Sequence, residues 1–240
     1  MAVLLDILQD ACDAWLGCGL PSPADAVRAA AWAPDAPGAW CLRCGSSRCG
    51  GAGPGGGPPA CAVRDGAPAS VDRVIRLGAH GGVLRDWVLA IKHQRWDAMA
   101  EALGAALGHQ LAGCGSLTAG QGTVVVPVPM PALRRWARGI DHAALLARQV
   151  ARTNGLRVVQ PMRQLHTGSQ VDADGRVARL SRGERFRWRG GTRAASAVCG
   201  RRVVVVDDVR TTGATLAEVA RLLRGVGAVA VDAAVVSVRE

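Results

Sequence analysis

Two neighbouring carboxylates, Asp207 and Asp208, follow a run of four valines in this sequence. A continuous valine run is typical of a strand that is buried on both faces of a sheet. In open α/β sheets, ligands bind outside the carboxyl ends of the strands, which is where this acidic pair would lie. Carboxylates cannot hold phosphate themselves, but they suit vicinal sugar hydroxyls or a Mg²⁺ ion. The pair therefore predicts a ligand contact at the strand end.

A turn of small residues connects the acidic pair to a predicted helix at 214–227. The free N–H groups and the dipole of a helix N-terminus favour an anion, and threonine hydroxyls add donors. Gly213 would let a phosphate approach the backbone closely. A diol-binding pair followed by a phosphate-binding turn predicts a ribose 5-phosphate site. The phosphate-binding residues would be Thr211, Thr212, Gly213, Ala214 and Thr215.

A second strand-to-loop junction carries arginines. The predicted strand at 123–129 ends in prolines around Pro127 and Val128, and three arginines come next. Guanidinium groups at this place could face a pyrophosphate through paired hydrogen bonds. In the alternative reading they flank a helix and are solvated. These arginines are Arg134, Arg135 and Arg138.

Six of the eight cysteines precede residue 62. Cys41 and Cys44 have the two-residue spacing of a zinc knuckle, which aims two thiolates at one metal ion. The first residues carry three aspartates and no basic charge, so they do not indicate a secretory signal, and a metal is favoured over disulfides. The predicted ligands are Cys41, Cys44 and Cys61, completed by Cys49 or Cys18; a metal-free remnant of such a site is the alternative.

Alternating strands and helices must position these groups. Apolar runs predict strands at 123–129, 202–208 and 228–238, and amphipathic patterns predict helices at 84–111, 140–155 and 214–227. Such alternation predicts an α/β fold with a parallel sheet covered on both faces. We expect two parts: a Cys- and Gly-rich N-terminal segment at 1–65 that could bind zinc, and one larger domain at 66–240.

The charge of the chain is concentrated in one block. The net charge is +10, and residues 120–205 hold 16 arginines against four acids. This excess indicates an anionic partner, either phosphate groups or nucleic acid. An arginine-rich surface inflated by codon usage is the alternative. No apolar run approaches the roughly 18 residues of a membrane span, so we expect a cytoplasmic protein with no membrane insertion.

Residues 203–216 resemble the signature of the phosphoribosyltransferases that bind phosphoribosyl pyrophosphate. Residues 124–152 are similar to a second block of the ComF family, the phosphoribosyltransferase-like proteins linked to DNA uptake. The matching residues there are Pro127, Val128, Pro129, Arg134, Arg135, Arg138 and Gly139, whereas Ile140, Asp141 and His142 replace the usual Phe-Asn-Gln. Upstream, Gly82–Arg85 and Ile91–Lys92, with the chain's single lysine, resemble a further family segment.

The resemblance implies a type I phosphoribosyltransferase-like parallel sheet flanked by helices, with a small Cys-rich N-terminal segment that often holds zinc. It implies phosphoribosyl pyrophosphate with Mg²⁺ as the ligand. Asp207 and Asp208 would bind the ribose hydroxyls, and Thr211 to Thr215 the 5-phosphate. In the family a hood covers the acceptor site; the residues here that fit it are Arg163, Gln170 and Arg185.

Two functions remain open at this point. The chain could transfer phosphoribosyl to an acceptor that the sequence does not name, which is pentosyl transfer. Alternatively, it could be a non-catalytic component of DNA uptake that binds nucleic acid or partner proteins, as the arginine-rich block and the cysteines favour. Thermal stabilisation by phosphoribosyl pyrophosphate, against salt-dependent DNA binding, would separate the two.

Overall fold

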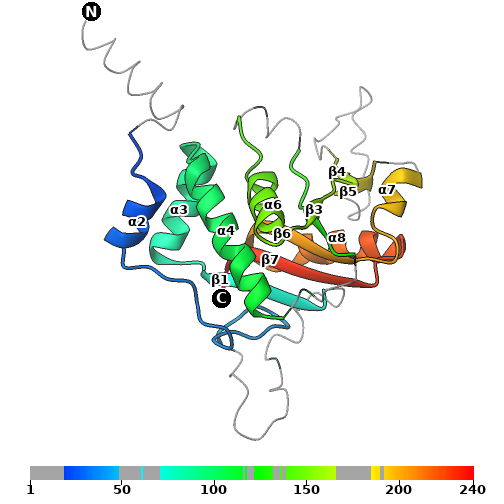
Figure 1. The fold of residues 1–240 in the computed structure, drawn as a ribbon, viewed down its shortest axis with the longest axis horizontal. Helices are drawn as coiled ribbons and strands as arrows, with labels where there is room; N and C mark the ends of the chain where they lie inside the picture. Colours follow the sequence, from blue (N-terminus) through cyan, green and yellow to red (C-terminus); the bar gives the residue numbers. More distant parts are fainter. Residues whose placement is uncertain are drawn as a thin grey trace, which may run out of the picture.

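The computed structural model describes residues 19–48, 61, 71–115, 117, 122–131, 136, 139–165, 185–189 and 192–240. Within these ranges a central parallel sheet has helices on both faces (Figure 1). The predicted architecture is confirmed: a parallel sheet is flanked by helices, and a Cys-rich N-terminal segment precedes it. The division of the chain at residue 65 stays a prediction.

Five parallel strands form the sheet in the order β1-β7-β6-β2-β3. Their bounds are β1 Arg73–Ala79, β2 Val124–Pro127, β3 Arg157–Val158, β6 Arg202–Arg210 and β7 Ala230–Val238. The three predicted strands are confirmed as β2, β6 and β7. β4 (Met162–Gln164) and β5 (Phe186–Trp188) form a separate antiparallel pair.

The helices lie in two layers. On one face are α3 (Gly82–His93), α4 (Asp97–Gly113) and α6 (His142–Thr153), and α8 (Ala214–Gly225) covers the other. Short helices α2 (Pro23–Ala29) and α7 (Thr192–Ser196) complete the set that the structure describes. The predicted helices at 140–155 and 214–227 are confirmed as α6 and α8.

The valine run of β6 supplies both cores. Val204 and Val206 pack in the core beneath α3, α4 and α6, whereas Val203 and Val205 pack in the core beneath α8. All four valine side chains are fully buried, as the sequence predicts for a strand covered on both faces. β6 is therefore held from both sides up to the residue before the acidic pair.

The single helix predicted at 84–111 is wrong. The chain forms two helices there, α3 and α4, and the break lies between His93 and Asp97. Arg95 has φ of 54°, in the left-handed region that an uninterrupted right-handed helix does not contain. The hydrophobic spacing continues across the break, because both helices bury their apolar faces in the same core.

The described part of the N-terminal segment packs on the edge of the sheet. Trp40 is buried, and its Nε1 donates to the carbonyl oxygen of Val74 in β1 at 3.0 Å. Arg76 of β1 is fully buried and pairs with Asp35 and Glu240, each at 2.7 Å. A buried guanidinium with two carboxylate partners binds this segment to the sheet through charge as well as apolar contact.

Helices α4 and α6 touch through a glycine. A Cβ placed on Gly104 would lie 2.8 Å from the Cβ of Gln149 and 3.0 Å from the carbonyl oxygen of Leu146. Neither neighbour is the far end of a flexible side chain, so the helices themselves would have to separate. Gly104 therefore sets how closely α6 approaches α4.

We expect Gly104→Ala to lower the free energy of unfolding by about 1–3 kcal/mol, because overpacking a well-packed contact has that cost. Gly113→Ala, in the same helix, is the matched control, since a Cβ there meets nothing within 4 Å. The control should be neutral or stabilising by up to about 1 kcal/mol. Urea denaturation of the two variants and the parent measures both effects; equal stabilities would show that α4 and α6 can separate freely.

Candidate functional site

The acidic pair lies within the last four residues of β6, where the strand emerges from the sheet core. Strand alternation turns the two side chains to opposite faces, so Asp208 follows Val206 toward α3 and α6. Asp207 follows Val205 toward the α8 face. Asp208 is buried and Asp207 is half-buried. The two carboxylates are thus adjacent in sequence but have different surroundings.

Two basic side chains converge on Asp208. Its Oδ2 lies 2.9 Å from Nζ of Lys92 and 3.0 Å from Nε2 of His142. Burial alone would raise the pKa of Asp208, but the contacts with His142 and Lys92 outweigh burial and hold that pKa below its usual range. Asp208 is therefore an ionised carboxylate.

Asp207 behaves in the opposite way. Burial and the neighbouring charge of Asp208 raise the pKa of Asp207 from 3.8 to about 8. The backbone N–H of Asp208 donates to Oδ1 of Asp207 at 2.9 Å, which counteracts only part of that rise. The pair therefore carries one proton near neutral pH, and the proton resides on Asp207.

The turn after β6 has the geometry of an anion-binding turn. Gly213 is the N-cap of α8 with φ 80° and ψ −2°, a left-handed conformation that favours glycine. Gly213 has no side chain to cap the helix, the N–H of Ala214 donates to Oγ1 of Thr212 at 3.4 Å, and the first turn of α8 holds no acidic residue. Thr211, Thr212 and Ala214 are exposed. The N–H groups at this helix end thus face solvent without a competing carboxylate.

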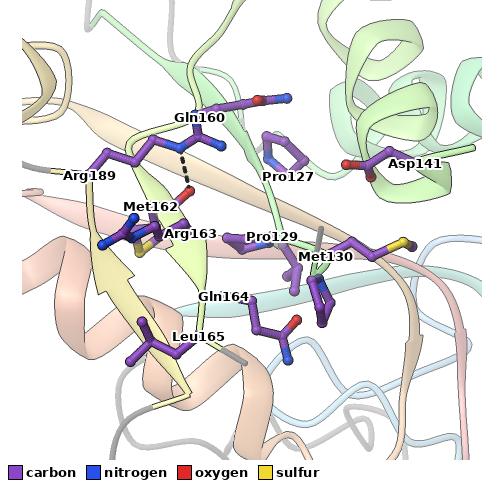
Figure 2. A pocket seen from close by; sticks show the side chains of 12 residues that line it. Pro127, Pro129, Met130, Asp141, Gln160, Met162, Arg163, Gln164, Leu165 and Arg189 are labelled. Atoms are coloured by element: carbon purple, nitrogen blue, oxygen red, sulfur yellow. Dashed lines mark hydrogen bonds between the residues drawn. The ribbon is translucent and has the colours of Figure 1, made fainter. Parts of the chain in front are cut away.

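A cavity of about 670 Å³ is lined by the loop after β2, the residue before α6 and the segments around β4 and β5 (Figure 2). The N–H of Val128 donates to the carbonyl oxygen of Val206 at 2.9 Å, so the loop after β2 lies next to the end of β6. Figure 2 shows Asp141 on one side of the cavity and Gln160, Arg163 and Arg189 on the other. Nε of Arg189 donates to the carbonyl oxygen of Met162 at 3.0 Å, which fixes that wall.

A cysteine cluster lies in the N-terminal segment. The Sγ atoms of Cys41, Cys44 and Cys61 are all within 4.8 Å of one another. Sulfurs bound tetrahedrally to one zinc ion at 2.3 Å would be roughly 3.8 Å apart, so these three thiols could hold a metal. A Cβ on Gly45, the residue after Cys44, would lie 2.9 Å from Cγ2 of Val238, which pairs with Arg210 at the end of β6. The cluster therefore lies near the end of β6.

The comparisons with known proteins agree with this geometry. A model of the phosphoribosyl transferase domain matches residues 116–239, just over half of the chain. The chain belongs to the phosphoribosyl transferase domain family. Both β6 with its turn and the loop after β2 lie inside the matched range of this phosphoribosyl transferase domain.

Two curated relatives are similar to part of this chain. The chain is 33% identical over 107 residues to competence protein F of Haemophilus influenzae, covering 43% of this chain and 44% of that protein. It is 34% identical over 110 residues to DNA utilization protein YhgH of Escherichia coli K12, covering 45% and 46%. The chain therefore matches under half the length of these relatives. The resemblance to the ComF family is confirmed.

A third relative is a named phosphoribosyltransferase. The chain is 62% identical over 37 residues to adenine phosphoribosyltransferase of Mycobacterium avium, covering 15% of this chain and 21% of that enzyme. Separately, no helix in the described ranges has the length and hydropathy needed to cross a membrane.

The predicted site residues of this phosphoribosyl transferase domain fall into three groups. Asp207, Asp208 and the turn 211–215 form one strand-to-helix junction, with Pro127 and Val128 beside it. Arg163 lines the cavity. Those that lie outside the described residues are Arg134, Arg135, Arg138, Gln170, Cys49 and Cys18.

Arg185 does not line the cavity with Arg163. Its Nε lies 3.0 Å from Oε2 of Glu218 in α8, and its guanidinium carbon lies 5.8 Å from the centre of the Phe186 ring. Arg185 thus joins β5 to α8. This contact places its guanidinium on a helix surface, where it packs the small antiparallel sheet onto the phosphoribosyl transferase domain.

Sequence reasoning missed the contacts of Lys92 and His142. His142 was counted only as a departure from the family pattern, and Lys92 only as a retained lysine. Their shared partner, Asp208, lies 116 and 66 residues further along the chain. The signal available in the sequence was that the chain's single lysine lies in a segment that resembles the ComF family.

The buried pair predicts a pH-dependent stability. The folded-state pKa of Asp207 lies above that of the unfolded chain, so the folded state binds more protons and loses stability as pH rises from about 4 toward 8. The depressed pKa of Asp208 has the opposite sign and acts only in acid. We expect Asp207→Asn to be more stable than the parent, by a margin that grows by up to about 1.4 kcal/mol per pH unit.

Urea unfolding of the parent and Asp207→Asn at pH 6 and pH 8 checks this expectation. Asp86→Asn is the control, since Asp86 is an exposed acid whose side chain is 70% accessible. The margin for Asp207→Asn should be larger at pH 8 than at pH 6. A margin that is the same at both pH values would mean that Asp207 is ionised in the folded protein throughout.

Proposed function

We propose that this chain binds phosphoribosyl pyrophosphate, together with Mg²⁺, at the carboxyl end of β6. The observation that carries the proposal is the junction of β6 and α8, where the acidic pair is followed five residues later by a left-handed glycine at the N-terminus of α8, with no acidic residue in the first turn of that helix. Such a junction offers carboxylates for sugar hydroxyls and N–H groups for a phosphate within one short segment. Separate sites for the sugar hydroxyls and the phosphate would need groups from different helices and strands.

The two ends of the junction bind different parts of the ligand. Asp207 and Asp208 accept hydrogen bonds from the ribose hydroxyls, and the turn formed by Thr211, Thr212, Gly213, Ala214 and Thr215 binds the 5-phosphate. The pyrophosphate extends toward the loop after β2, where Pro127 and Val128 lie beside β6. Arg134, Arg135 and Arg138 follow this loop in the sequence and would bind the pyrophosphate on this proposal.

A magnesium ion fits the donors on this side of the molecule. Mg²⁺ prefers oxygen ligands and is commonly bound through one or two carboxylates together with the phosphates of a substrate. Asp207 and Asp141 are acidic side chains close enough to affect each other electrostatically, and Mg²⁺ binding at Asp207 would release its proton. When bound, Mg²⁺ neutralises charge on the pyrophosphate and so makes it a better leaving group.

The reaction would be pentosyl transfer. A bond forms between a nucleophilic atom of the acceptor and the anomeric carbon, and the bond from that carbon to pyrophosphate breaks. The chain need not supply a nucleophile; it holds both reactants and stabilises the charge that develops on the leaving group. The acceptor would occupy the cavity lined by Arg163, Gln164 and Asp141.

A second function is favoured by two observations. The curated relatives are named as a competence protein and a DNA utilization protein, and the chain has an arginine-rich block. On this alternative, the chain is a cytoplasmic component of DNA uptake that keeps the ligand-binding fold and binds nucleic acid or partner proteins. The well-formed junction at β6 favours the ligand-binding function.

Titration calorimetry with phosphoribosyl pyrophosphate and Mg²⁺ tests the proposal. The parent should bind, and Gly213→Val should lose measurable binding, because a valine at φ 80° costs on the order of 1–3 kcal/mol and intrudes on the phosphate. Gly225→Ala, at the other end of α8, is the control, since a Cβ there meets nothing within 4 Å. Circular dichroism of each sample reports the fold. A parent that binds no phosphoribosyl pyrophosphate would sink the proposal.

We propose in addition that Cys41, Cys44 and Cys61 bind zinc. Three thiolates are a soft donor set that suits this ion, and Cys49 or Cys18 would complete a tetrahedral site. The cluster lies in a segment that also contacts the sheet through Trp40. A zinc ion here would therefore stabilise the packing of the N-terminal segment against β1.

We expect protein prepared without a histidine tag to contain up to one equivalent of zinc by elemental analysis. Cys44→Ser should reduce that amount by at least half and lower the melting temperature. Cys199→Ser is the control, because Cys199 is exposed and lies outside the cluster. Its zinc content should equal that of the parent. Parent protein that is fully folded and metal-free would contradict the zinc assignment.

A further inference from the structure

Asp208 is held by side chains from two helices that are not neighbours in sequence. Lys92 is in the last turn of α3, and His142 is the first residue of α6. Both approach the same carboxylate oxygen, Oδ2, at 2.9 and 3.0 Å. Two contacts on one oxygen fix both the position and the rotation of the carboxylate group.

These contacts are enclosed. The side chains of Lys92, His142 and Asp208 are 21%, 7% and 12% exposed. A buried charge pair is screened little by solvent, so its geometry is maintained far better than that of an exposed pair. A surface pair such as Arg85 with Asp86, at 3.7 Å and more than half exposed, is screened by solvent and does not fix its two side chains in this way.

We propose that Lys92 and His142 are positioning residues for the ribose-binding carboxylate: they fix Asp208 so that its carboxylate faces the sugar hydroxyls. This inference rests on the proposed function, and it assigns a role that the phosphoribosyltransferase signature at β6 does not contain. Neither residue needs to touch the ligand. Each acts through Asp208.

The surrounding charges are consistent with that role. His80, after β1, contacts Oγ of Ser237 through Nδ1 at 2.8 Å. Burial and then the charges of Lys92 and Arg85 lower the pKa of His80. On the neighbouring carboxyl, Asp207, the charges that act are those of Asp208, Lys92 and Asp141. Lys92 and His142 are thus the basic groups that the described residues place in contact with Asp208.

His142 holds its place through the start of α6. The carboxylate of Asp141 accepts from the N–H of Ala144 at 3.0 Å, which caps the helix and sets where His142 begins. With Nε2 directed at Asp208, the buried Nδ1 has no hydrogen-bond partner among the described residues. A glutamine side chain could present an N–H to the same oxygen.

The test compares two ligands that differ only in hydroxyls. Ribose 5-phosphate and tetrahydrofurfuryl phosphate share a five-membered ring and a phosphate, but the second has no ring hydroxyls. The ratio of their affinities therefore measures hydroxyl recognition separately from phosphate binding. For the parent we expect ribose 5-phosphate to bind at least 30-fold more tightly. Calorimetry at constant salt gives both constants.

Lys92→Met keeps the aliphatic stem and removes the charge, and His142→Leu removes the polar ring. We expect each to lower the affinity for ribose 5-phosphate at least tenfold while changing that for tetrahydrofurfuryl phosphate less than twofold. His142→Gln should restore most of the loss, because it again donates to Asp208. Arg85→Met and His93→Leu, at exposed positions of the same helix, are the controls and should match the parent.

A double variant covers the case in which Lys92→Met fails to fold with an unpaired buried Asp208. Lys92→Met in an Asp208→Asn background should bind ribose 5-phosphate as Asp208→Asn alone does, because Lys92 acts only through Asp208. An additional tenfold loss in the double variant would overturn the inference. So would a loss of affinity that is equal for the two ligands, since that indicates a general distortion of the fold.

The inference and the proposed function fail in different ways. If the parent binds neither ribose 5-phosphate nor phosphoribosyl pyrophosphate, the proposed function is wrong, and the positioning role with it. If the parent binds both and the variants keep the parent's affinity ratio, only the positioning role is wrong.

Discussion

Burial of two neighbouring carboxylates at the end of β6 is the constraint on which the rest of the site depends. Like charges this close cannot both be ionised without compensation, and the strand is closed on both faces by packed valines. The surrounding side chains therefore give the two acids different pKa values. Asp208 receives Lys92 and His142, whereas Asp207 retains a proton. Three elements that are separate in sequence, α3, α6 and β6, must therefore meet at one oxygen atom.

The arrangement of helices follows from the same requirement. α3 and α6 cover one face of the sheet, and each contributes one of the two groups at Asp208. Close contact between α4 and α6 at Gly104 keeps α6 against the sheet. The opposite face, covered by α8, carries no such convergence among the described residues, and there the helix instead presents its N-terminus to solvent. The two faces thus supply different chemistry to one strand end.

Much of the frame could be predicted from local pattern. The valine runs, the helix at 214–227 and the glycine of the turn depend on neighbours in sequence, and each was located correctly. β1 was not predicted, because Arg73 and Arg76 interrupt its apolar pattern. Those arginines are accommodated by acids far along the chain, Asp232 for one and Asp35 with Glu240 for the other. The contacts of Lys92 and His142 with Asp208 were missed for the same reason: they depend on partners that sequence spacing does not reveal.

The place of Lys92 on α3 has a consequence for how this protein can change. Four apolar residues, Leu84, Trp87, Val88 and Ile91, fix the rotation of α3 on the sheet, and Lys92 directly follows the last of them. Each residue of an α-helix advances the side-chain direction by about 100°. Inserting one residue between Ile91 and Lys92 would turn the ammonium group away from Asp208, although every side chain would still be present. This helix should therefore accept many exchanges of residue type on its outer side and very few changes in length.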